Sequence, residues 1–341
     1  MIMNASLTSE ASCTFLKPAV EQTTQIFIGN IVTIVVESLI AVFATASNAM
    51  IAFVIWKTRA LHCASNTLLC CLAVTDFFTG MVVAPLNIAT KLGEMQHNTG
   101  LYCIVGVAGS LATWIVASVT FLTLTLISIE RFLALRLHLR YKTLVTSRRI
   151  LKVIAAFWVL ITTLCMLRFW DVKETYVRPI VIGNIAINLI VTIYCYRKIY
   201  ETVIHHRKLI KQESSACETS NIERNDDMGG LPSKKRENLR MLRYRSSTLT
   251  MAYVVGFILF CYSPIFVYQI VVGLWKGLDE QATRVAYRCC VTVALLKSAL
   301  NPLLYCMRLN DIRTVLKKTL KGWYEVQARK FPSIFTPKFK K

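Results

Sequence analysis

Residues 26–56 read IFIGNIVTIVVESLIAVFATASNAMIAFVIW, an apolar stretch in which Glu37 is the one charged side chain. About 20 residues of helix suffice to cross the roughly 30 Å hydrocarbon core of a bilayer. Six further stretches have the same character, at 64–90, 101–129, 150–170, 179–196, 248–274 and 285–307. Backbone polar groups in lipid must be satisfied within the segment, which favours helices over strands. The sequence therefore predicts an all-α membrane protein with seven transmembrane helices.

The composition of the whole chain agrees with this prediction. Of its 341 residues, 55% are apolar and 17% are charged, and the mean hydropathy is +0.49. A soluble domain has about 45–50% apolar residues and about a quarter charged ones. An ordinary cytosolic enzyme is therefore excluded, because too few charged residues remain to cover so much apolar surface.

The positions of the basic residues predict the orientation. Of the 40 Lys and Arg, 31 fall after the first, third and fifth spans, at the adjoining membrane edges or in the C-terminal tail. The positive-inside rule then places the tail in the cytoplasm and the N-terminus outside, as in a multi-pass plasma-membrane protein. The net charge of +21 is expected to attract anionic membrane lipid. The sequence contains no folded basic domain, so binding to nucleic acid is not expected.

The segments outside the spans complete the expected organisation. Residues 1–25 form an extracellular segment without a cleavable signal peptide, and Asn4 begins a glycosylation sequon. The transmembrane domain covers 26–307, and its long cytoplasmic loop, 197–247, is expected to be partly disordered because its middle is charged and Ser/Asn-rich. Residues 308–341 read as an amphipathic eighth helix on the inner leaflet followed by a basic tail.

Several kinds of functional site have no support in the sequence. The five histidines fall in loops or at membrane edges, which disfavours a metal site. There is no phosphate-binding glycine loop and no nucleophile paired with a base, so neither an enzyme nor a cofactor is expected. Cys13, Cys103 and either Cys289 or Cys290 could form a disulfide at the outer face, with connectivity left open.

A few polar residues lie inside the expected spans, where ionisable groups are costly and are functional candidates by default. The intramembrane polar core comprises Asn48, Asp76, Lys297 and Ser298. Glu130 and Arg131 lie at the inner end of the third span. Pro264 interrupts the sixth helix, and Asn301-Pro302-Leu303-Leu304-Tyr305 ends the seventh.

In this order the residues resemble the rhodopsin-like family of G-protein-coupled receptors. The motifs that carry the resemblance are Asn48 in the first helix, LAVTD with Asp76, ISIERF with Arg131, Trp158, Tyr196, FCYSP with Pro264, and NPLLY at 301–305. Two of them depart from the family pattern, because Phe132 stands for the usual Tyr and Tyr262 for the usual Trp. The resemblance covers about residues 25–325.

The resemblance implies a heterotrimeric G protein as the cytoplasmic partner and assigns roles to individual residues. Glu130 would hold Arg131 at rest and release it to the G protein on activation. Tyr196 and Tyr305 would swing inward, and Tyr262 would form the floor of the ligand cavity. The remaining residues implied in coupling are Leu139, which would fill a hydrophobic pocket on the G protein, and Pro264, Asn301 and Pro302.

Lys297 is the main departure from the family pattern. The family usually has Asn at this position, where it helps the equivalent of Asp76 to bind a sodium ion. Two opposite charges in a low-dielectric bundle should pair, so an ion pair between Asp76 and Lys297 is expected in place of sodium. The alternatives are that Lys297 snorkels to the membrane edge or remains neutral. A retinal-binding lysine is rejected, because Leu295 occupies the opsin position.

The ligand is not fixed by the sequence. Thr113 stands where amine receptors carry Asp, which disfavours amines. The short loop DVKETYVR lacks cysteine, as in the melanocortin branch, whereas Glu37 resembles a feature of adenosine receptors. The chain is thus similar to a group of melanocortin, lysolipid, cannabinoid and adenosine receptors. A small, weakly polar, nucleoside-like or lipid-like ligand is expected in a cavity lined by Glu37, Thr113, Trp114, Ile265, Phe266, Gln269 and Leu295.

Two other classes of membrane protein remain as alternatives. A seven-helix decoy or scavenger would bind a ligand without G-protein coupling, but it predicts a damaged arginine motif, and Arg131 is intact. A transporter would show glycine-rich broken helices near the membrane centre, which only Gly183 and Gly256 approach. The G-protein subtype and the oligomeric state stay open.

Overall fold

The computed structural model describes residues 23–137, 140–166, 182–202, 204, 233–275, 277–308 and 310–330. All regular secondary structure in these residues is helical, which confirms the all-α prediction. Several expectations lie outside the described residues: the sequon at Asn4, the residues Cys13 and Leu139, the loop at 171–178 and most of the middle of loop 197–247.

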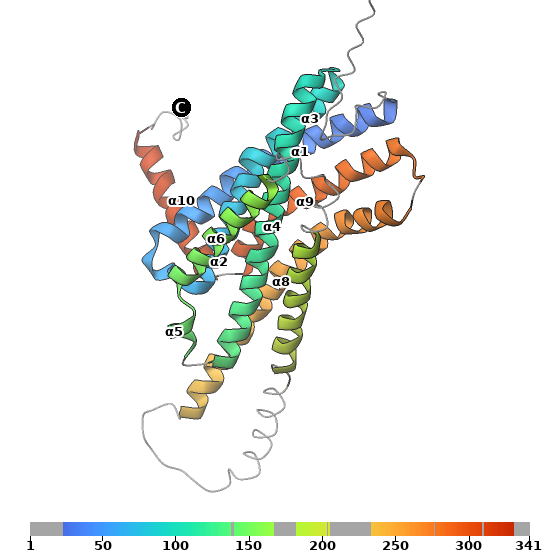
Figure 1. Cartoon of the computed structure of the whole chain (residues 1–341). Coiled ribbons are helices and arrows are strands. Elements are labelled where there is room, and N and C mark those ends of the chain that lie inside the picture. Colours follow the sequence, from blue (N-terminus) through green and yellow to red (C-terminus); the bar gives the residue numbers. More distant parts are fainter. Residues whose placement is uncertain are drawn as a thin grey trace, which may run out of the picture. The chain divides into compact units, whose positions relative to one another are not determined.

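Each predicted span corresponds to helix in the structure (Figure 1). The long helices are α1 (Thr24–Lys57), α2 (Ala64–Phe78) with η2 (Thr79–Val83) and α3 (Ala84–Met95), α4 (Thr99–Leu137), α6 (Ser147–Met166), a helix over 182–202, α8 (Ser233–Leu274) and α9 (Glu280–Arg308). In the described part of the chain, six helices are long and apolar enough to cross a membrane. The helix over 182–202 stands at the fifth predicted span, which is the least hydrophobic of the seven.

The second span is not one regular helix. It passes from α2 through η2, a π-helical turn, into α3, in which Pro85 lies in the first turn. Because proline has no N–H, Pro85 cannot donate to the preceding turn, and a π-turn accommodates the missing bond. Gly80 lies within this turn, and a Cβ there would come within 2.8 Å of the Thr45 backbone nitrogen of α1. Glycine thus permits the close approach of these two helices.

α8 extends beyond its predicted span, whereas α10 (Asn310–Lys330) lies within its predicted segment. α8 begins at Ser233, so the helix includes residues 233–238 of the loop for which partial disorder is expected. These residues include Lys, Arg and Glu, which favour helix, and Pro232 precedes them in sequence. After the NPLLY motif, α10 forms the predicted eighth helix. Ile312 is buried in it, while Arg313, Lys317 and Lys318 are exposed, as its amphipathic pattern requires.

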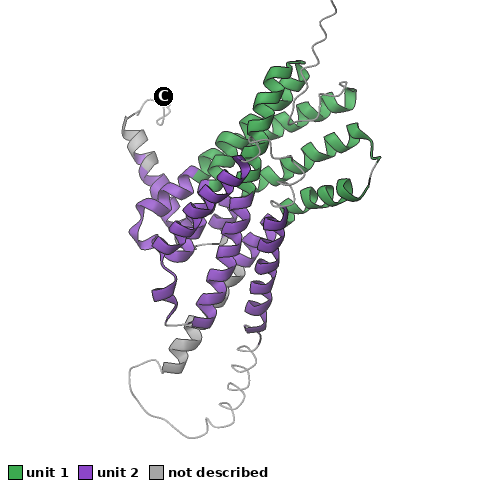
Figure 2. Cartoon of the chain, in the orientation of Figure 1, with its two compact units in different colours: residues 1–48, 75–117, 259–300 green, residues 49–74, 118–258, 301–341 purple. Residues whose placement is uncertain are grey.

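The chain divides into two compact units that draw on the same long helices (Figure 2). Unit 1 comprises residues 1–48, 75–117 and 259–300, and unit 2 comprises 49–74, 118–258 and 301–341. Among the buried apolar side chains of unit 1 are Ile40, Ala44, Val83 and Leu111. Those of unit 2 include Leu68, Leu72, Phe121, Leu124 and Ile258.

Candidate functional site

The Asp76–Lys297 pair lies in unit 1 and joins α2 to α9. The Lys297 ammonium is 2.6 Å from Asp76 Oδ1, and the two side chains are 1% and 0% exposed. The Ser298 hydroxyl donates to the same carboxylate oxygen at 2.8 Å. The expected ion pair is therefore confirmed, and the burial of Lys297 excludes snorkelling.

The other members of the predicted polar core lie close to this pair. Asn48 is fully buried, and its amide donates to the carbonyl oxygens of Ala44 at 2.9 Å and Ser298 at 2.7 Å. The bond from Asn48 to Ser298 joins α1 to α9 at the residue that follows Lys297. The ammonium also lies 5.7 Å from the centre of the Tyr262 ring, within the range of a cation–π interaction.

A second buried pair in unit 1 involves Glu37, a predicted ligand-cavity residue of α1. The Lys91 ammonium of α3 lies 2.7 Å from Glu37 Oε1, with 7% and 0% of the two side chains exposed. The Thr292 hydroxyl of α9 donates to the same oxygen at 2.7 Å. Sequence reasoning missed both partners: Lys91 lies one residue beyond the predicted second span, and Thr292 is an uncharged residue inside the seventh.

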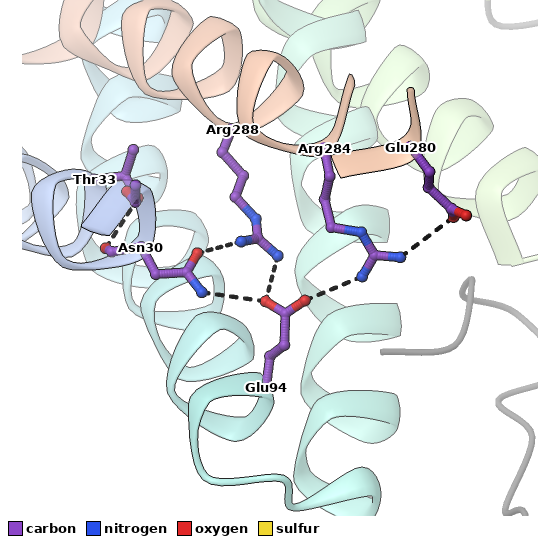
Figure 3. A network of polar contacts seen from close by, with 7 residues as sticks. Asn30, Thr33, Glu94, Glu280, Arg284 and Arg288 are labelled. Atoms are coloured by element: carbon purple, nitrogen blue, oxygen red, sulfur yellow. Dashed lines mark hydrogen bonds and ion pairs between the residues drawn. The ribbon is translucent and has the colours of Figure 1, made fainter. Parts of the chain in front are cut away.

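A third group of charges, the Glu94 network, is shown in Figure 3. The Arg284 guanidinium donates to Glu94 Oε1 at 3.0 Å, and that of Arg288 donates to Glu94 Oε2 and to the Asn30 side chain. The Asn30 amide donates to Glu94 Oε2 at 3.3 Å, and Glu280 lies 3.6 Å from Arg284. Because Glu94 is only 1% exposed, this network joins α1, α3 and α9 through a desolvated carboxylate.

Unit 2 contains a different arrangement around the arginine motif of α4. Arg131 Nε lies 3.0 Å from Oε2 of its chain neighbour Glu130, with 5% and 3% of the side chains exposed. The Ser65 hydroxyl of α2 donates to Glu130 Oε1 at 2.8 Å. The Tyr141 hydroxyl of α5 (Tyr141–Leu144) donates to the same oxygen. The contact between Glu130 and Arg131 was expected, whereas Ser65 and Tyr141 were not.

Tyr141 remains a hydrogen-bond donor because of its surroundings. Burial raises the pKa of its phenol, and the neighbouring Glu130 carboxylate raises that pKa further. A negative phenolate would have to form partly desolvated and beside another negative charge. The neutral O–H therefore persists well above neutral pH, and Tyr141 keeps its bond to Glu130.

The remaining predicted residues divide between the two units. All seven ligand-cavity residues belong to unit 1, where Glu37 and Leu295 are buried and the other five are half-buried. Tyr262 and Pro264 also lie in unit 1, with Pro264 inside α8. Tyr196, Asn301, Pro302 and Tyr305 belong to unit 2 together with Glu130 and Arg131, and Tyr305 is fully buried.

The structure also narrows the disulfide prediction. Cys103 is disulfide-bonded, whereas Cys289 and Cys290 are free thiols. The proposed pairing with Cys289 or Cys290 is therefore wrong. Cys13, the other cysteine of that prediction, lies outside the described residues.

Comparisons with known proteins match most of the helical region. The family model described as 7 transmembrane receptor (rhodopsin family) matches residues 47–178 and 163–305. The histamine H2 receptor of Cavia porcellus is 25% identical over 305 residues, covering 83% of this chain and 78% of the relative. The 5-hydroxytryptamine receptor 1F of Mus musculus is 23% identical, covering 84% and 91%. The adenosine receptor A2b of Mus musculus is 22% identical, covering 86% and 91%.

Proposed function

The chain belongs to the rhodopsin family of seven-transmembrane receptors, and from this membership we propose that it activates a heterotrimeric G protein. An extracellular ligand would bind at unit 1, and the G protein would be activated at unit 2. The family consists of signalling receptors rather than enzymes, and the protein is a multi-pass protein of the plasma membrane. The proposal places the N-terminus outside and the basic tail in the cytoplasm, in agreement with the distribution of Lys and Arg.

The observation that carries the proposal is the Glu130–Arg131 pair. A nearly buried guanidinium at the end of an apolar helix needs a partner, and Glu130 provides one at 3.0 Å. In the proposed mechanism the G protein replaces Glu130 as the partner of Arg131. Activation would also rearrange the other proposed coupling residues: Leu139, Tyr196, Tyr262, Pro264, Asn301, Pro302 and Tyr305.

The ligand is proposed to be small and weakly polar, nucleoside-like or lipid-like. The predicted cavity has few polar side chains besides Glu37, and Thr113 stands in place of the acidic residue that would bind an amine. The hydroxyl of Thr113 already donates to the Gly109 carbonyl at 2.7 Å. By their names, relatives of this chain respond to histamine, 5-hydroxytryptamine or adenosine, and the proposal favours a ligand of the third kind over the first two.

The Asp76–Lys297 pair should make signalling independent of sodium. The ammonium lies against the carboxylate that a sodium ion would need, so the cation is already part of the chain. Lys297→Asn should therefore introduce a dependence of ligand potency on sodium concentration. Concentration–response curves in sodium and in N-methylglucamine buffers would test this, and equal sodium effects on both proteins would contradict it.

The proposed function is tested by G-protein activation in cells that express the wild type or Arg131→Ala at matched surface levels. The panel should contain nucleosides, lipids, amines and peptides, with a sensor for each G-protein family. A response of the wild type that Arg131→Ala loses would support the proposal. A ligand that binds the wild type without activating any G protein would contradict coupling and favour a decoy receptor, and net uptake of a compound would favour a transporter.

A further inference from the structure

Three buried groups in unit 1 have hydrogen-bonding capacity that the described residues leave unused. Glu37 Oε2, the Asn87 side-chain nitrogen and the Lys91 ammonium have no hydrogen-bond partner, apart from the 2.7 Å ion pair between Lys91 and Glu37 Oε1. An ammonium has three N–H donors and a primary amide nitrogen has two. A buried polar group without a partner is costly, and such groups call for an explanation.

Two of these groups are in contact, and the third lies one helical turn away on the same helix. Lys91 contacts Glu37 directly, and Asn87 lies four residues before Lys91 on α3, on the same face of that helix. The amide oxygen of Asn87 is turned toward α4, where a Cβ on Gly109 would lie 3.4 Å from it. The hydroxyl of Thr113 donates to the Gly109 carbonyl, so a predicted ligand-cavity residue lies one helical turn along α4.

The charges decide which kind of ligand suits these groups. Glu37 and Lys91 already form a neutral pair. A ligand ammonium would add a second cation beside Lys91, and a ligand carboxylate or phosphate would face the Glu37 carboxylate. A hydroxyl can donate to Glu37 Oε2 and accept from Lys91, and a second hydroxyl beside it can accept from Asn87. Adjacent hydroxyls thus use all three groups without adding charge.

We infer that Glu37, Lys91 and Asn87 form a subsite for a neutral ligand that carries two adjacent hydroxyl groups. The inference rests on the proposed function and specifies the ligand class for that same site in unit 1. Two sources of this chemistry are the ribose of a nucleoside and the glycerol of a monoacylglycerol. An amine such as histamine or 5-hydroxytryptamine is disfavoured by the same groups.

The test is a binding measurement that does not depend on coupling. The thermal midpoint of the full-length, detergent-solubilised protein should be followed against concentrations of adenosine, 2′,3′-dideoxyadenosine, 1-oleoylglycerol, ethyl oleate, histamine and 5-hydroxytryptamine. A rise with adenosine but not with its dideoxy analogue identifies a nucleoside diol. A rise with 1-oleoylglycerol but not with ethyl oleate identifies a glycerol lipid.

Asn87→Leu is the variant of choice, because it removes the amide donor without leaving a charge unpaired. It should raise the half-maximal concentration of the active diol on the order of tenfold, as expected for one lost hydrogen bond to a neutral group. Asn66→Leu is the matched control: this asparagine lies in unit 2, where its amide donates to the Leu61 carbonyl, and its loss should leave diol affinity unchanged. The double variant Glu37→Gln, Lys91→Met keeps the site neutral and should also weaken diol binding.

Several outcomes would overturn the inference. The first is that the analogues without the diol bind as well as the diols, and the second is that the amines bind whereas neither diol does. The third is that neither diol shifts the thermal midpoint at millimolar concentration. The fourth is that Asn87→Leu leaves the diol affinity unchanged. The proposed function is tested separately by Arg131→Ala, which should keep the thermal shift and lose G-protein activation. Diol binding without activation would reject coupling and support the subsite.

Discussion

The two units use buried charge in different ways. Among the described residues of unit 1, the buried ion pairs join residues on different helices, as in Asp76 with Lys297 and Glu94 with Arg284. In unit 2 the described arginine motif pairs two residues that are neighbours in the chain, Glu130 and Arg131. Neighbouring side chains on a helix point about 100° apart and do not face each other. Arg131 Nε nevertheless lies 3.0 Å from Glu130 Oε2.

This difference indicates a division between holding helices together and switching. Breaking an interhelical pair in unit 1 leaves a buried charge and removes a connection between helices. Breaking the Glu130–Arg131 pair removes no connection between helices, because both residues remain on α4. The ion pairs of unit 1 are thus suited to stability, and the pair in unit 2 is suited to changing partners.

The largest expected effect comes from the deepest pair. Lys297→Met should destabilise the protein by about 3–5 kcal/mol, because the Asp76 carboxylate stays buried without its cation. The double variant Lys297→Met, Asp76→Leu should recover most of this loss. Thermal unfolding of detergent-solubilised protein provides the comparison. If the double variant is no more stable than the single one, the pair does not account for the stability.

The next prediction concerns the Glu94 network. Glu94→Gln should cost about 2–3 kcal/mol, because two guanidinium groups lose the charged acceptor to which they both donate. Glu280→Gln serves as the control, since Glu280 is 50% exposed and 3.6 Å from Arg284. Its effect should stay below about 1 kcal/mol, as for exposed ion pairs. Equal shifts of the thermal midpoint in the two variants would remove the distinction between buried and exposed pairs.

A smaller effect is expected at the third partner of Glu130. Tyr141→Phe removes one hydrogen bond to a carboxylate that Ser65 and Arg131 still contact, and it should cost about 1 kcal/mol. Because the raised pKa keeps the phenol protonated, the difference between wild type and variant should not change between pH 6 and pH 8. Thermal midpoints across this range would test the statement, and a difference that varies with pH would contradict it.

Several of these features could be predicted from the sequence. Apolar length alone located the spans, since lipid imposes both helix and a minimum number of residues. The Asp76–Lys297 pair was predictable because two opposite charges inside hydrocarbon have few other partners. Glu130 and Arg131 were found through their adjacency in ISIERF.

Other features depended on the register between helices, which the sequence does not encode locally. Glu94 and Arg284 are 190 residues apart. Both lie at the end of a span, where a charged residue looks in the sequence like part of a loop. Ser65 and Tyr141 are ordinary polar residues near helix ends, and only the packed structure brings them to Glu130. The π-turn at η2 lies just before Pro85, and the close approach of Gly80 to α1 is visible only in the packed structure.

The most direct test of the division between the units is basal G-protein activation without ligand. Glu130→Gln and Glu94→Gln should be compared with the wild type at matched surface expression. Both variants remove one buried negative charge. The account predicts that Glu130→Gln raises basal activation several-fold, because Arg131 loses its charged partner, and that Glu94→Gln leaves basal activation unchanged and lowers stability. Unchanged basal activation in Glu130→Gln, or an equal rise in both variants, would contradict it.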